Sequence, residues 1–228
     1  MEAIILAGGL GTRLRSVVAH LPKAMAPIAD RPFLEILLAD LARKGFKRIV
    51  LSLGFMADKI SSHFGASFEG VELAYVVEDT PLGTGGALRL ALTACTRDHV
   101  FVFNGDTFLD LDVRAVEQYW QKGQQTIVIG KRVLDTERYG RLVAEGDWLI
   151  GFSEKGIRGP GLINAGCYVM TANALEAFPL NQSFSLEKDY LKPMIARGSV
   201  KVFVTNDLFI DIGIPEDYAQ AQTFLMFK

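Results

Sequence analysis

The 228-residue chain contains few residues of the types that build hydrolase triads or metal clusters. Its two cysteines, Cys95 and Cys167, lack metal-ligand spacing and sit in apolar surroundings, so we expect two buried thiols in a reducing cytoplasm. Its three histidines, His20, His63 and His99, are scattered along the chain. Because Gly-x-Ser-x-Gly is also absent, no hydrolase triad can be recognised.

Long apolar runs and an excess of positive charge are missing as well. No segment has about 18 uninterrupted apolar residues, so no membrane span is expected. The first residues already read as a strand, with no basic and apolar leader, so no secretory signal is expected. The 24 Lys+Arg and 26 Asp+Glu give a net charge of −2, which argues against a nucleic-acid-binding surface. The expectation is a cytoplasmic protein without nucleic-acid or membrane partners.

What the chain does have is enough apolar material for a large core. Half of the residues are hydrophobic, and the length fits one domain over residues 1–228, with room for a small lid. We find no linker, low-complexity stretch or internal repeat. No C-terminal β-helix of the kind that carries an acyltransferase activity would fit.

The first half alternates short apolar runs with helical patterns. Strands are predicted at residues 3–6, 48–53, 71–77 and 99–103. Helical spacing is found in two sets, Leu34, Leu37, Leu38 and Leu41 between Pro32 and Gly45, and Leu88, Ala91, Leu92 and Cys95. This βαβ alternation predicts a Rossmann-like three-layer α/β fold with a mostly parallel mixed sheet.

The second half is richer in short strands. These are predicted at residues 126–131, 141–144, 149–152 and 166–170, separated by turn residues. They suggest a smaller mixed subsheet over the carboxyl edge of the main sheet. A final helix is predicted to begin at Pro215, with Glu216 and Asp217 in its first turn, where acidic side chains favour the helix dipole.

The first predicted strand runs into a glycine-rich turn that carries one arginine, Arg13. Gly8, Gly9 and Gly11 would let backbone N–H groups approach phosphate oxygens, and the guanidinium would add a fork of donors. No Gly-Lys-Ser/Thr closes a Walker A loop, and Leu14 stands where a dinucleotide fingerprint needs glycine. On these residues alone, a tight strand-to-helix turn remains an alternative.

Seven motifs in one order resemble the sugar-phosphate nucleotidyltransferase family. They are Leu6–Leu14 with Pro22-Lys23, Pro81–Ala87, Asn104-Gly105-Asp106, Tyr139-Gly140, Glu154-Lys155, Asn164-Ala165-Gly166 and Asp211–Tyr218. Within the family, the segments at 22–28, 31–35, 161–164 and 209–213 are similar to the D-glycero-D-manno-heptose 1-phosphate guanylyltransferase group. One departure is Ala24, where that group more often has proline.

The resemblance implies transfer of a nucleotidyl group from a nucleoside triphosphate to a sugar 1-phosphate, with release of pyrophosphate. The nucleophile is already an anion, so positioning and electrostatic stabilisation would carry the catalysis. Asp106 and Asp211 would bind Mg²⁺. Arg13 and Lys23 would complete the catalytic set by neutralising the triphosphate, with Lys23 reaching the α-phosphate.

The family's binding residues map onto matching motif positions. The expected nucleotide contacts are Leu6, Ala7, Gly8, Gly9, Gly11, Thr12, Arg13, Lys23, Glu78, Pro81, Gly83, Thr84, Gly85 and Asp106. The expected sugar-phosphate contacts are Gly105, Gly140, Glu154, Lys155, Asn164 and Glu187, with Lys155 on the phosphate. Without the other motifs, the pair at 154–155 would be interpreted as a solvated charge pair in a loop.

The resemblance places the base against Gly8, Glu78 and the Gly83–Gly85 turn. A carboxylate can accept both adjacent donors of guanine, whereas an amide suits uracil or thymine, so Glu78 favours GTP; an ordinary solvated acid is the alternative at this position. The resemblance implies D-glycero-α-D-manno-heptose 1-phosphate as the sugar substrate, giving GDP-heptose for bacterial surface polysaccharide. Alternatives are mannose or N-acetylmuramic acid 1-phosphate with GTP or UTP. A non-catalytic nucleotide-sugar sensor is another, but the chain keeps Arg13, Lys23, Asp106 and Asp211.

A glycosyltransferase that uses Asp110-Leu111-Asp112 as a metal motif is a third class of function. Asp112 precedes Val113, Val116 and Trp120 at helical spacing, which favours a helix cap instead. The sequence leaves the sugar undetermined, because sugar pockets use few hydrogen bonds on variable loops. The sequence also does not determine the oligomeric state, so a homodimer is one of the alternatives.

Overall fold

The computed structural model describes residues 1–9, 11, 14, 18, 20–153 and 156–226. Its strands are β1 Glu2–Leu6, β2 Pro27–Ile28, β3 Arg31–Pro32, β4 Arg48–Leu53, β5 Ser67–Phe68, β6 Val71–Val77, β7 His99–Asn104, β8 Thr107–Leu109, β9 Thr126–Val133, β10 Leu142–Glu145, β11 Trp148–Phe152, β12 Gly161–Thr171, β13 Val200–Thr205 and β14 Phe209–Asp211. Its helices are α1 Phe33–Arg43, α2 Ala57–Phe64, α3 Gly83–Leu92, α4 Val113–Gln121, α5 Lys192–Ala196 and α6 Pro215–Leu225, with a 3₁₀ turn η2 at Lys23–Met25 and a π-helix η3 at Leu186–Leu191.

One large mixed sheet forms the middle layer, in the order β10-β11-β13-β9-β12-β7-β1-β4-β6-β5. The strands β7, β1, β4 and β6 are parallel neighbours, and so are β13 and β9. Only β11, β12 and β5 run against the common direction among the strands of the described chain. The predicted mostly parallel mixed sheet is confirmed.

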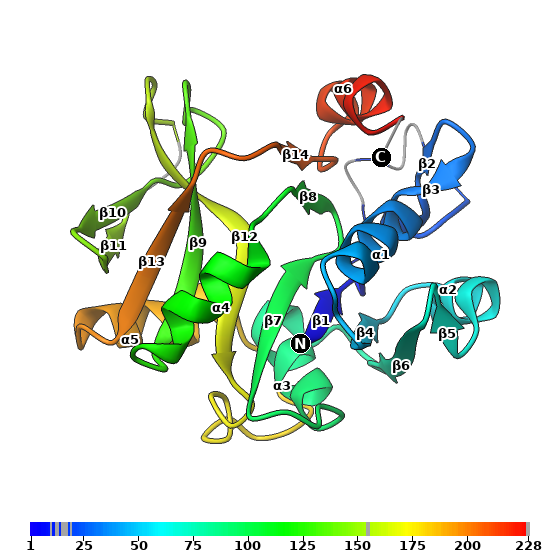
Figure 1. The fold of residues 1–228 in the computed structure, drawn as a ribbon, viewed down its shortest axis with the longest axis horizontal. Coiled ribbons are helices and arrows are strands. Elements are labelled where there is room, and N and C mark those ends of the chain that lie inside the picture. The colour runs from blue at the N-terminus through cyan, green and yellow to red at the C-terminus, as the bar shows by residue number, and fades with distance from the viewer. Residues whose placement is uncertain (10, 12–13, 15–17, 19, 154–155, 227–228) are drawn as a thin grey trace.

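Alternation along the strands explains why helices cover both faces of this sheet. In β1, Ala3 and Ile5 belong to one buried cluster, whereas Ile4 belongs to another on the opposite face. The first cluster includes the apolar sides of α1, α2, α4 and α6, and the second those of α3, η3 and α5. Figure 1 shows α1 and α4 in front of the sheet and α3 behind it. These are the three predicted layers.

The second-half strands differ from the expected separate subsheet. They are mixed, as predicted, but they continue the main sheet, because β12 pairs antiparallel with β7 on one side and with β9 on the other. At 11 residues β12 is also longer than the predicted strand at 166–170. The two small separate sheets are instead the hairpin β2-β3 and the pair β8-β14.

The helix boundaries follow the predicted signals except at one residue. Helix α1 begins after Pro32, and Gly45 follows its end with a φ of 90°. Helix α6 begins at Pro215 with acidic residues in its first turn. Helix α3 ends at Leu92, so Cys95 lies beyond it and is only partly buried, which corrects the prediction of two buried thiols. Burial still raises the pKa of the Cys95 thiol to about 12.

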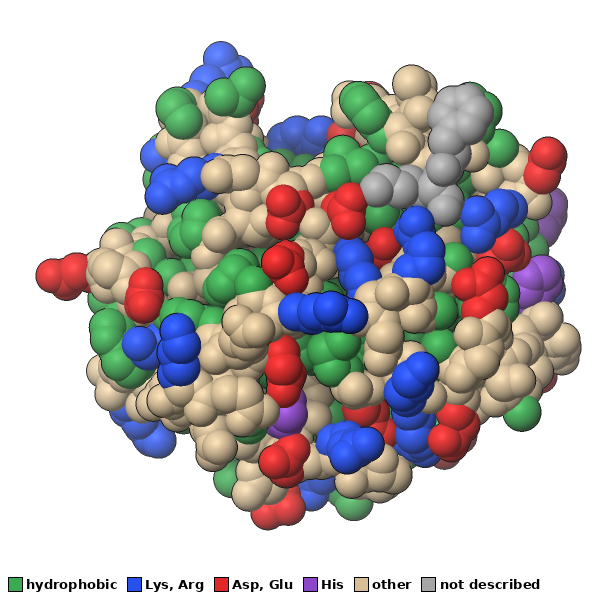
Figure 2. Space-filling model, viewed as in Figure 1, with side chains coloured by type: hydrophobic (Ala, Val, Ile, Leu, Met, Phe, Trp, Pro, Cys, Tyr) green, Lys and Arg blue, Asp and Glu red, His purple; other side chains and the backbone are tan. Residues whose placement is uncertain are grey.

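Among the described residues, no helix is long and apolar enough to cross a membrane. The face shown in Figure 2 carries Lys and Arg side chains interleaved with Asp and Glu. This mixing means that the visible face offers no continuous basic track for a polyanion such as nucleic acid.

Candidate active site

A cavity of about 700 Å³ opens where the parallel strands β1, β4 and β7 end. Carboxyl ends of parallel strands are the usual ligand side of an open α/β sheet. Eleven of the predicted nucleotide contacts line it, namely Leu6, Ala7, Gly8, Gly9, Gly11, Lys23, Glu78, Pro81, Gly83, Thr84 and Asp106. Thr12 and Arg13 lie outside the described residues.

The glycine-rich turn has little space between its backbone and neighbouring side chains. A Cβ on Gly11, whose φ is 58°, would lie 2.8 Å from the Cβ of Lys23. A Cβ on Gly8 would lie 3.0 Å from Oε1 of Glu78. The turn therefore needs these glycines so that its backbone can lie directly against the lysine and the glutamate of the cavity.

The glutamate is held in a fixed orientation inside this cavity. Its Oε2 accepts a hydrogen bond of 3.0 Å from the N–H of Leu82, just before α3. Its Oε1 lies against both Gly8 and Gly54, because a Cβ on Gly54 would also come close to it, at 2.8 Å. One carboxylate oxygen of Glu78 is thus anchored to backbone, and the other is directed toward the glycine-rich turn.

The two predicted metal ligands are brought together by the small sheet β8-β14. In this antiparallel pair Thr107 lies opposite Asp211, and the N–H of Ile212 donates to the carbonyl of Asp106 over 2.9 Å. Lys23 Nζ lies 2.5 Å from Oδ2 of Asp106. Residues that are far apart in the sequence thus form a compact group of two carboxylates and one ammonium at the edge of the cavity.

Electrostatics in this group favour a further cation. Burial, together with the neighbouring Asp106 charge, raises the pKa of Asp211 above the ordinary aspartate range, while Lys23 opposes the rise. Burial is the larger cause, and the repulsion from Asp106 adds to it. No group of three or more acidic, His or Cys residues forms a metal cluster in the described part of the chain. The donor set is two carboxylates, which suits Mg²⁺ completed by phosphate oxygens and water.

On the sugar side, two predicted residues also meet. Asn164 Nδ2 donates to Oε1 of Glu187 over 2.9 Å and to the hydroxyl of Tyr168 over 2.8 Å. Its Oδ1 accepts from the N–H of Gly166 over 3.0 Å. Gly166 has a φ of 67°, and a Cβ there would lie 2.6 Å from Nδ2 of Asn104, which lines the cavity. The Asn164–Glu187 pair therefore lies next to the nucleotide cavity.

The remaining sugar-phosphate predictions differ in outcome. Gly105 lines the nucleotide cavity itself, and a Cβ on it would lie 2.8 Å from the carbonyl oxygen of Leu6. Gly140 lies beside Ser153, whose carbonyl oxygen is 3.2 Å from the position of a Cβ on Gly140. Glu154 and Lys155 lie outside the described residues, so their predicted roles come from the motif alone.

Comparison with known proteins decides the family. The family model described as "Nucleotidyl transferase" matches residues 2–227 of the chain. The chain belongs to this family.

Two relatives and one solved structure are similar to this nucleotidyl transferase over nearly their full length. The chain is 40% identical over 224 residues to a D-glycero-alpha-D-manno-heptose 1-phosphate guanylyltransferase of Aneurinibacillus thermoaerophilus, covering 97% of each chain. It is 39% identical over 219 residues to the enzyme of that name from Campylobacter jejuni, covering 96% of this chain and 97% of the relative. The crystal structure of HddC from Yersinia pseudotuberculosis complexed with GMP-PN matches with a TM-score of 0.88 and 38% identity, covering 100% of this chain and 99% of that one.

One predicted nucleotide contact of this nucleotidyl transferase, Gly85, is not among the residues that line the cavity. A Cβ on it would lie 2.2 Å from the ring of Phe184. Its N–H donates to the carbonyl of Phe184 over 3.0 Å. The glycine is therefore needed for close packing of the chain near Phe184 against α3, and its predicted contact with the nucleotide base stays a prediction.

Several cavity residues were missed by sequence reasoning. They are Ala24, Ser52, Gly54, Phe55, Asp79, Thr80, Ala87 and Asn104. Ser52, Gly54 and Phe55 could have been found, because the strand predicted at 48–53 ends there and its carboxyl end should face the ligand. Ala87 and Asn104 belong to the motifs at 81–87 and 104–106 but were not singled out as contacts, and Ala24, Asp79 and Thr80 lie next to predicted contacts.

The alternative acidic motif is structural, as the helical spacing predicted. Asp112 Oδ1 accepts hydrogen bonds from the N–H groups of Arg114 and Ala115, over 3.1 and 3.0 Å. It is thus the N-cap of α4. His99, for its part, is held between Asp98 and Glu117 and stacks on Trp120. These groups have structural partners away from the large cavity.

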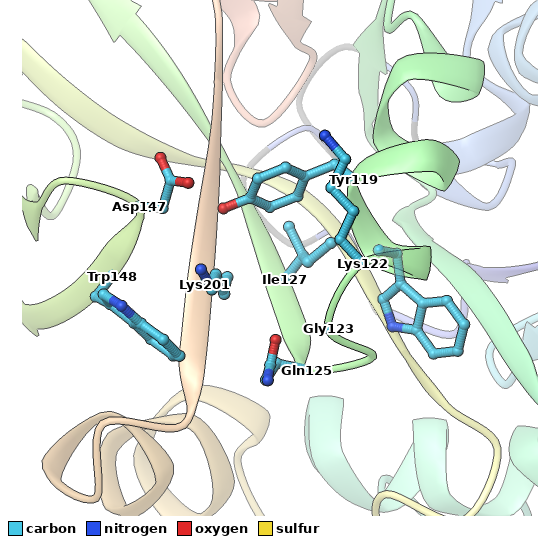
Figure 3. A pocket seen from close by; sticks show the side chains of 9 residues that line it. Tyr119, Lys122, Gly123, Gln125, Ile127, Asp147, Trp148 and Lys201 are labelled. Carbon is cyan, nitrogen blue, oxygen red and sulfur yellow. The ribbon is translucent and has the colours of Figure 1, made fainter.

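A smaller cavity of about 320 Å³ lies at the C-terminal end of α4. In Figure 3, Tyr119 and Lys122 come from the α4 end, Asp147 and Trp148 from the β10-β11 turn, and Lys201 from β13. Lys201 Nζ already lies 4.2 Å from the Trp148 ring centroid and 5.9 Å from that of Tyr119. Of the predicted site residues that the structure describes, none lines this cavity, so the larger one is the candidate active site.

Proposed function

We propose that the protein transfers a guanylyl group from GTP to D-glycero-α-D-manno-heptose 1-phosphate. A phosphate oxygen of the sugar 1-phosphate would form a bond to the α-phosphorus of GTP. The bond from the α-phosphorus to the bridging oxygen would break, and pyrophosphate would leave with that electron pair. The observation that carries the proposal is the convergence of Lys23, Asp106 and Asp211 on a glycine-lined cavity.

Mg²⁺ fits this donor set, and Asp106 and Asp211 would hold it. When bound, it would supply positive charge against the phosphate oxygens. Two further observations support the fit: β8-β14 brings both carboxylates together, and burial with the Asp106 charge raises the pKa of Asp211. A cation between the two carboxylates would relieve both the burial cost and the repulsion that raise this pKa.

Lys23 would bring its ammonium to the α-phosphate. Its short 3₁₀ turn lies against Gly11, so the lysine and the glycine-rich turn hold each other in place. Its contact with Asp106 would give way to phosphate as the nucleotide enters. The nucleophile is already ionised, so the chain needs to position and stabilise charge rather than abstract a proton.

Glu78 would read the base. Its Oε2 is fixed by the Leu82 N–H, so Oε1 is presented next to Gly8 in the cavity. The carboxylate has acceptor capacity for the adjacent N1–H and amino donors of guanine. The names of the full-length relatives, which are guanylyltransferases, support the same base.

The Asn164–Glu187 pair would contact sugar hydroxyls. An amide and a carboxylate present both donors and acceptors, as a polyhydroxy ligand requires. Mannose 1-phosphate is the main competing acceptor, because a mannose-1-phosphate guanylyltransferase of Mycobacterium tuberculosis is 32% identical over 232 residues. The chain covers 65% of that relative but 97% of the first heptose enzyme, which favours heptose.

The deciding experiment measures pyrophosphate release with four nucleoside triphosphates against heptose, mannose and N-acetylmuramic acid 1-phosphates. GTP with the heptose phosphate should give the highest kcat/KM, and EDTA should abolish turnover. Asp211→Asn, purified in parallel, controls for contaminating transferases. A preference for UTP or dTTP, or for mannose 1-phosphate, would reject that part of the proposal. Binding of GDP-sugars without any pyrophosphate release would favour the sensor alternative.

A further inference from the structure

Two connections on the sugar side, residues 134–141 between β9 and β10 and residues 156–160 before β12, form one hydrogen-bonded unit, here called the sugar-side loops. Thr136 is fully buried, and its hydroxyl donates to the carbonyl of Ile157 over 2.7 Å. It also accepts from Arg141 Nε over 2.5 Å. Asp135 Oδ1 accepts from the N–H of Gly159 over 3.1 Å. Because the two connections are bonded to each other, they should move together.

Arg138 joins these loops to the C-terminal helix α6. Its Nη1 donates to Oδ1 of Asp217 over 2.9 Å, and its Nη2 donates to Oδ2, so the contact is bidentate. The Asp217 side chain is only 12% exposed, and a carboxylate at that depth needs a cationic partner. The next residue, Tyr139, packs its ring edge-on against Phe209 of β14, with centroids 6.2 Å apart.

The other side of α6 is attached to the segment that follows Lys23. The hydroxyl of Tyr218 donates to the carbonyl of Pro27, and Gln222 Nε2 donates to the same oxygen over 2.8 Å. The N–H of Ala29 in turn donates to Gln222 Oε1 over 2.9 Å. Figure 1 shows α6 above β14 and beside the β2-β3 hairpin. Helix α6 therefore links the sugar-side loops to the lysine side of the active site.

We propose that Arg138 is a positioning residue for sugar-phosphate transfer. Its contact with Asp217 fixes the sugar-side loops, which carry Gly140 and flank positions 154–155, relative to Asp211 at the end of β14. This inference rests on the proposed function. Without the guanidinium, Asp217 would be a buried carboxylate with no ion-pair partner among the described residues, and the loops would lose their bidentate attachment to α6. A displacement of about 1 Å at reacting groups can cost a hundredfold in rate.

The test is a double-mutant cycle with Arg138→Met and Asp217→Asn. Each single variant should lower kcat/KM for the sugar 1-phosphate at least about tenfold, mainly through KM, while KM for GTP stays within about twofold. The double variant should lose no more than the worse single variant, because both changes remove one contact. Arg138→Lys should fall between wild type and Arg138→Met, since lysine keeps the charge but not the fork.

Arg158→Met is a matched control. Arg158 lies in the same loops and pairs with Glu137 over 2.8 Å, but its side chain is 80% exposed. Exposed pairs contribute little, so this variant should keep both KM values. Amide hydrogen exchange should rise over 134–141, 156–160 and the first turn of α6 in Arg138→Met, and not in Arg158→Met.

Three results would overturn the inference: unchanged KM for the sugar 1-phosphate, an equal rise in both KM values, or additive losses in the double variant. A lower melting temperature with unchanged kinetic constants would likewise assign Arg138 to stability alone. A wild type that releases no pyrophosphate would contradict the proposed function instead. The exchange measurement would then still decide the attachment, because unchanged protection in Arg138→Met would reject it.

Discussion

The two halves of the candidate site are built in different ways. The nucleotide half lies at the ends of β1, β4 and β7, parallel strands whose turns are adjacent because the sheet makes them so. Its defining contacts involve backbone, such as the approach of Gly11 to Lys23. The sugar half combines β12, η3 and the sugar-side loops, and its defining contacts join side chains, such as Asn164 to Glu187.

The two halves therefore differ in the amino-acid substitutions that they can tolerate. In the nucleotide half, a Cβ on Gly105 would lie 2.8 Å from the carbonyl oxygen of Leu6, so a larger residue there would displace backbone. In the sugar half, where the contacts join side chains, one amide or carboxylate residue can be substituted without moving the backbone. We therefore expect substitutions of Asp106 and Asp211, which lie at the seam between the two halves, to lower turnover with all substrates. Substitutions within one half should change the kinetic constants for one substrate only.

The largest effect is expected at the seam, where Asp106 and Asp211 meet. Asp106→Asn or Asp211→Asn should cut turnover at least about a hundredfold with every substrate pair, because a charge-stabilising group is lost. Steady-state pyrophosphate release measures this. Near-normal turnover in either variant, together with EDTA resistance of the wild type, would remove the metal assignment.

Stability supplies the control for those variants. The pKa of Asp211 is raised in the folded chain, so in the absence of metal its ionised form costs folding free energy above that pKa, and stability increases as pH falls through it. Asp211→Asn removes this cost while the amide oxygen can still accept from the Gly213 N–H. Its melting temperature at neutral pH should equal or exceed that of wild type without metal.

The next effect sharpens the nucleotide half. In Glu78→Gln the amide oxygen should take the Leu82 N–H, so the amide NH₂ would face the donors of guanine. The mismatch should cost about 1–3 kcal/mol with GTP. The ratio of kcat/KM for GTP to that for dTTP should fall accordingly, while KM for the sugar 1-phosphate is kept. An unchanged ratio would mean that Glu78 does not read the base.

A smaller effect is expected in the sugar half. Glu187→Ala removes the acceptor of Asn164 Nδ2 and should raise KM for the sugar 1-phosphate about tenfold, with KM for GTP unchanged. Glu187→Gln is the matched control, since its amide oxygen can keep that hydrogen bond. Its KM for the sugar 1-phosphate should lie between those of wild type and Glu187→Ala. Loss of GTP affinity in Glu187→Ala would contradict the assignment of the two halves to different substrates.

The smallest effect lies outside both halves, at the cap of α4. Asp112→Ala should lower the free energy of unfolding by about 1 kcal/mol and leave turnover unchanged, because Asp112 only satisfies two N–H groups. Asp112→Asn should be close to wild type in both respects. Denaturant titration and pyrophosphate release measure the two quantities. A strong loss of activity in Asp112→Asn would revive the glycosyltransferase alternative.

Much of this organisation could be predicted from local sequence. Strand and helix patterns indicated the layers, and the cap at Asp112 followed from helical spacing. The glycine turn and its strand predicted the cavity lining, and the motif order predicted the family. A prediction failed where strand partners are distant in sequence: the second-half strands join the main sheet through β12 instead of forming a subsheet of their own. The packing of Gly85 against Phe184, 99 positions later, was likewise not predicted. Local patterns carry no information on such partners.

The sequence by itself predicted which groups of this protein would do chemistry. Arg13, Lys23, Asp106 and Asp211 were predicted because each stands in a short motif that can be recognised from neighbouring residues. Only the tertiary structure decided how such groups meet: the register of β8 against β14 places Asp211 beside Asp106, and Arg138 reaches Asp217 across 79 positions of the chain. The physical reason is that strand register and buried ion pairs are set by packing of the whole chain, which no single segment encodes.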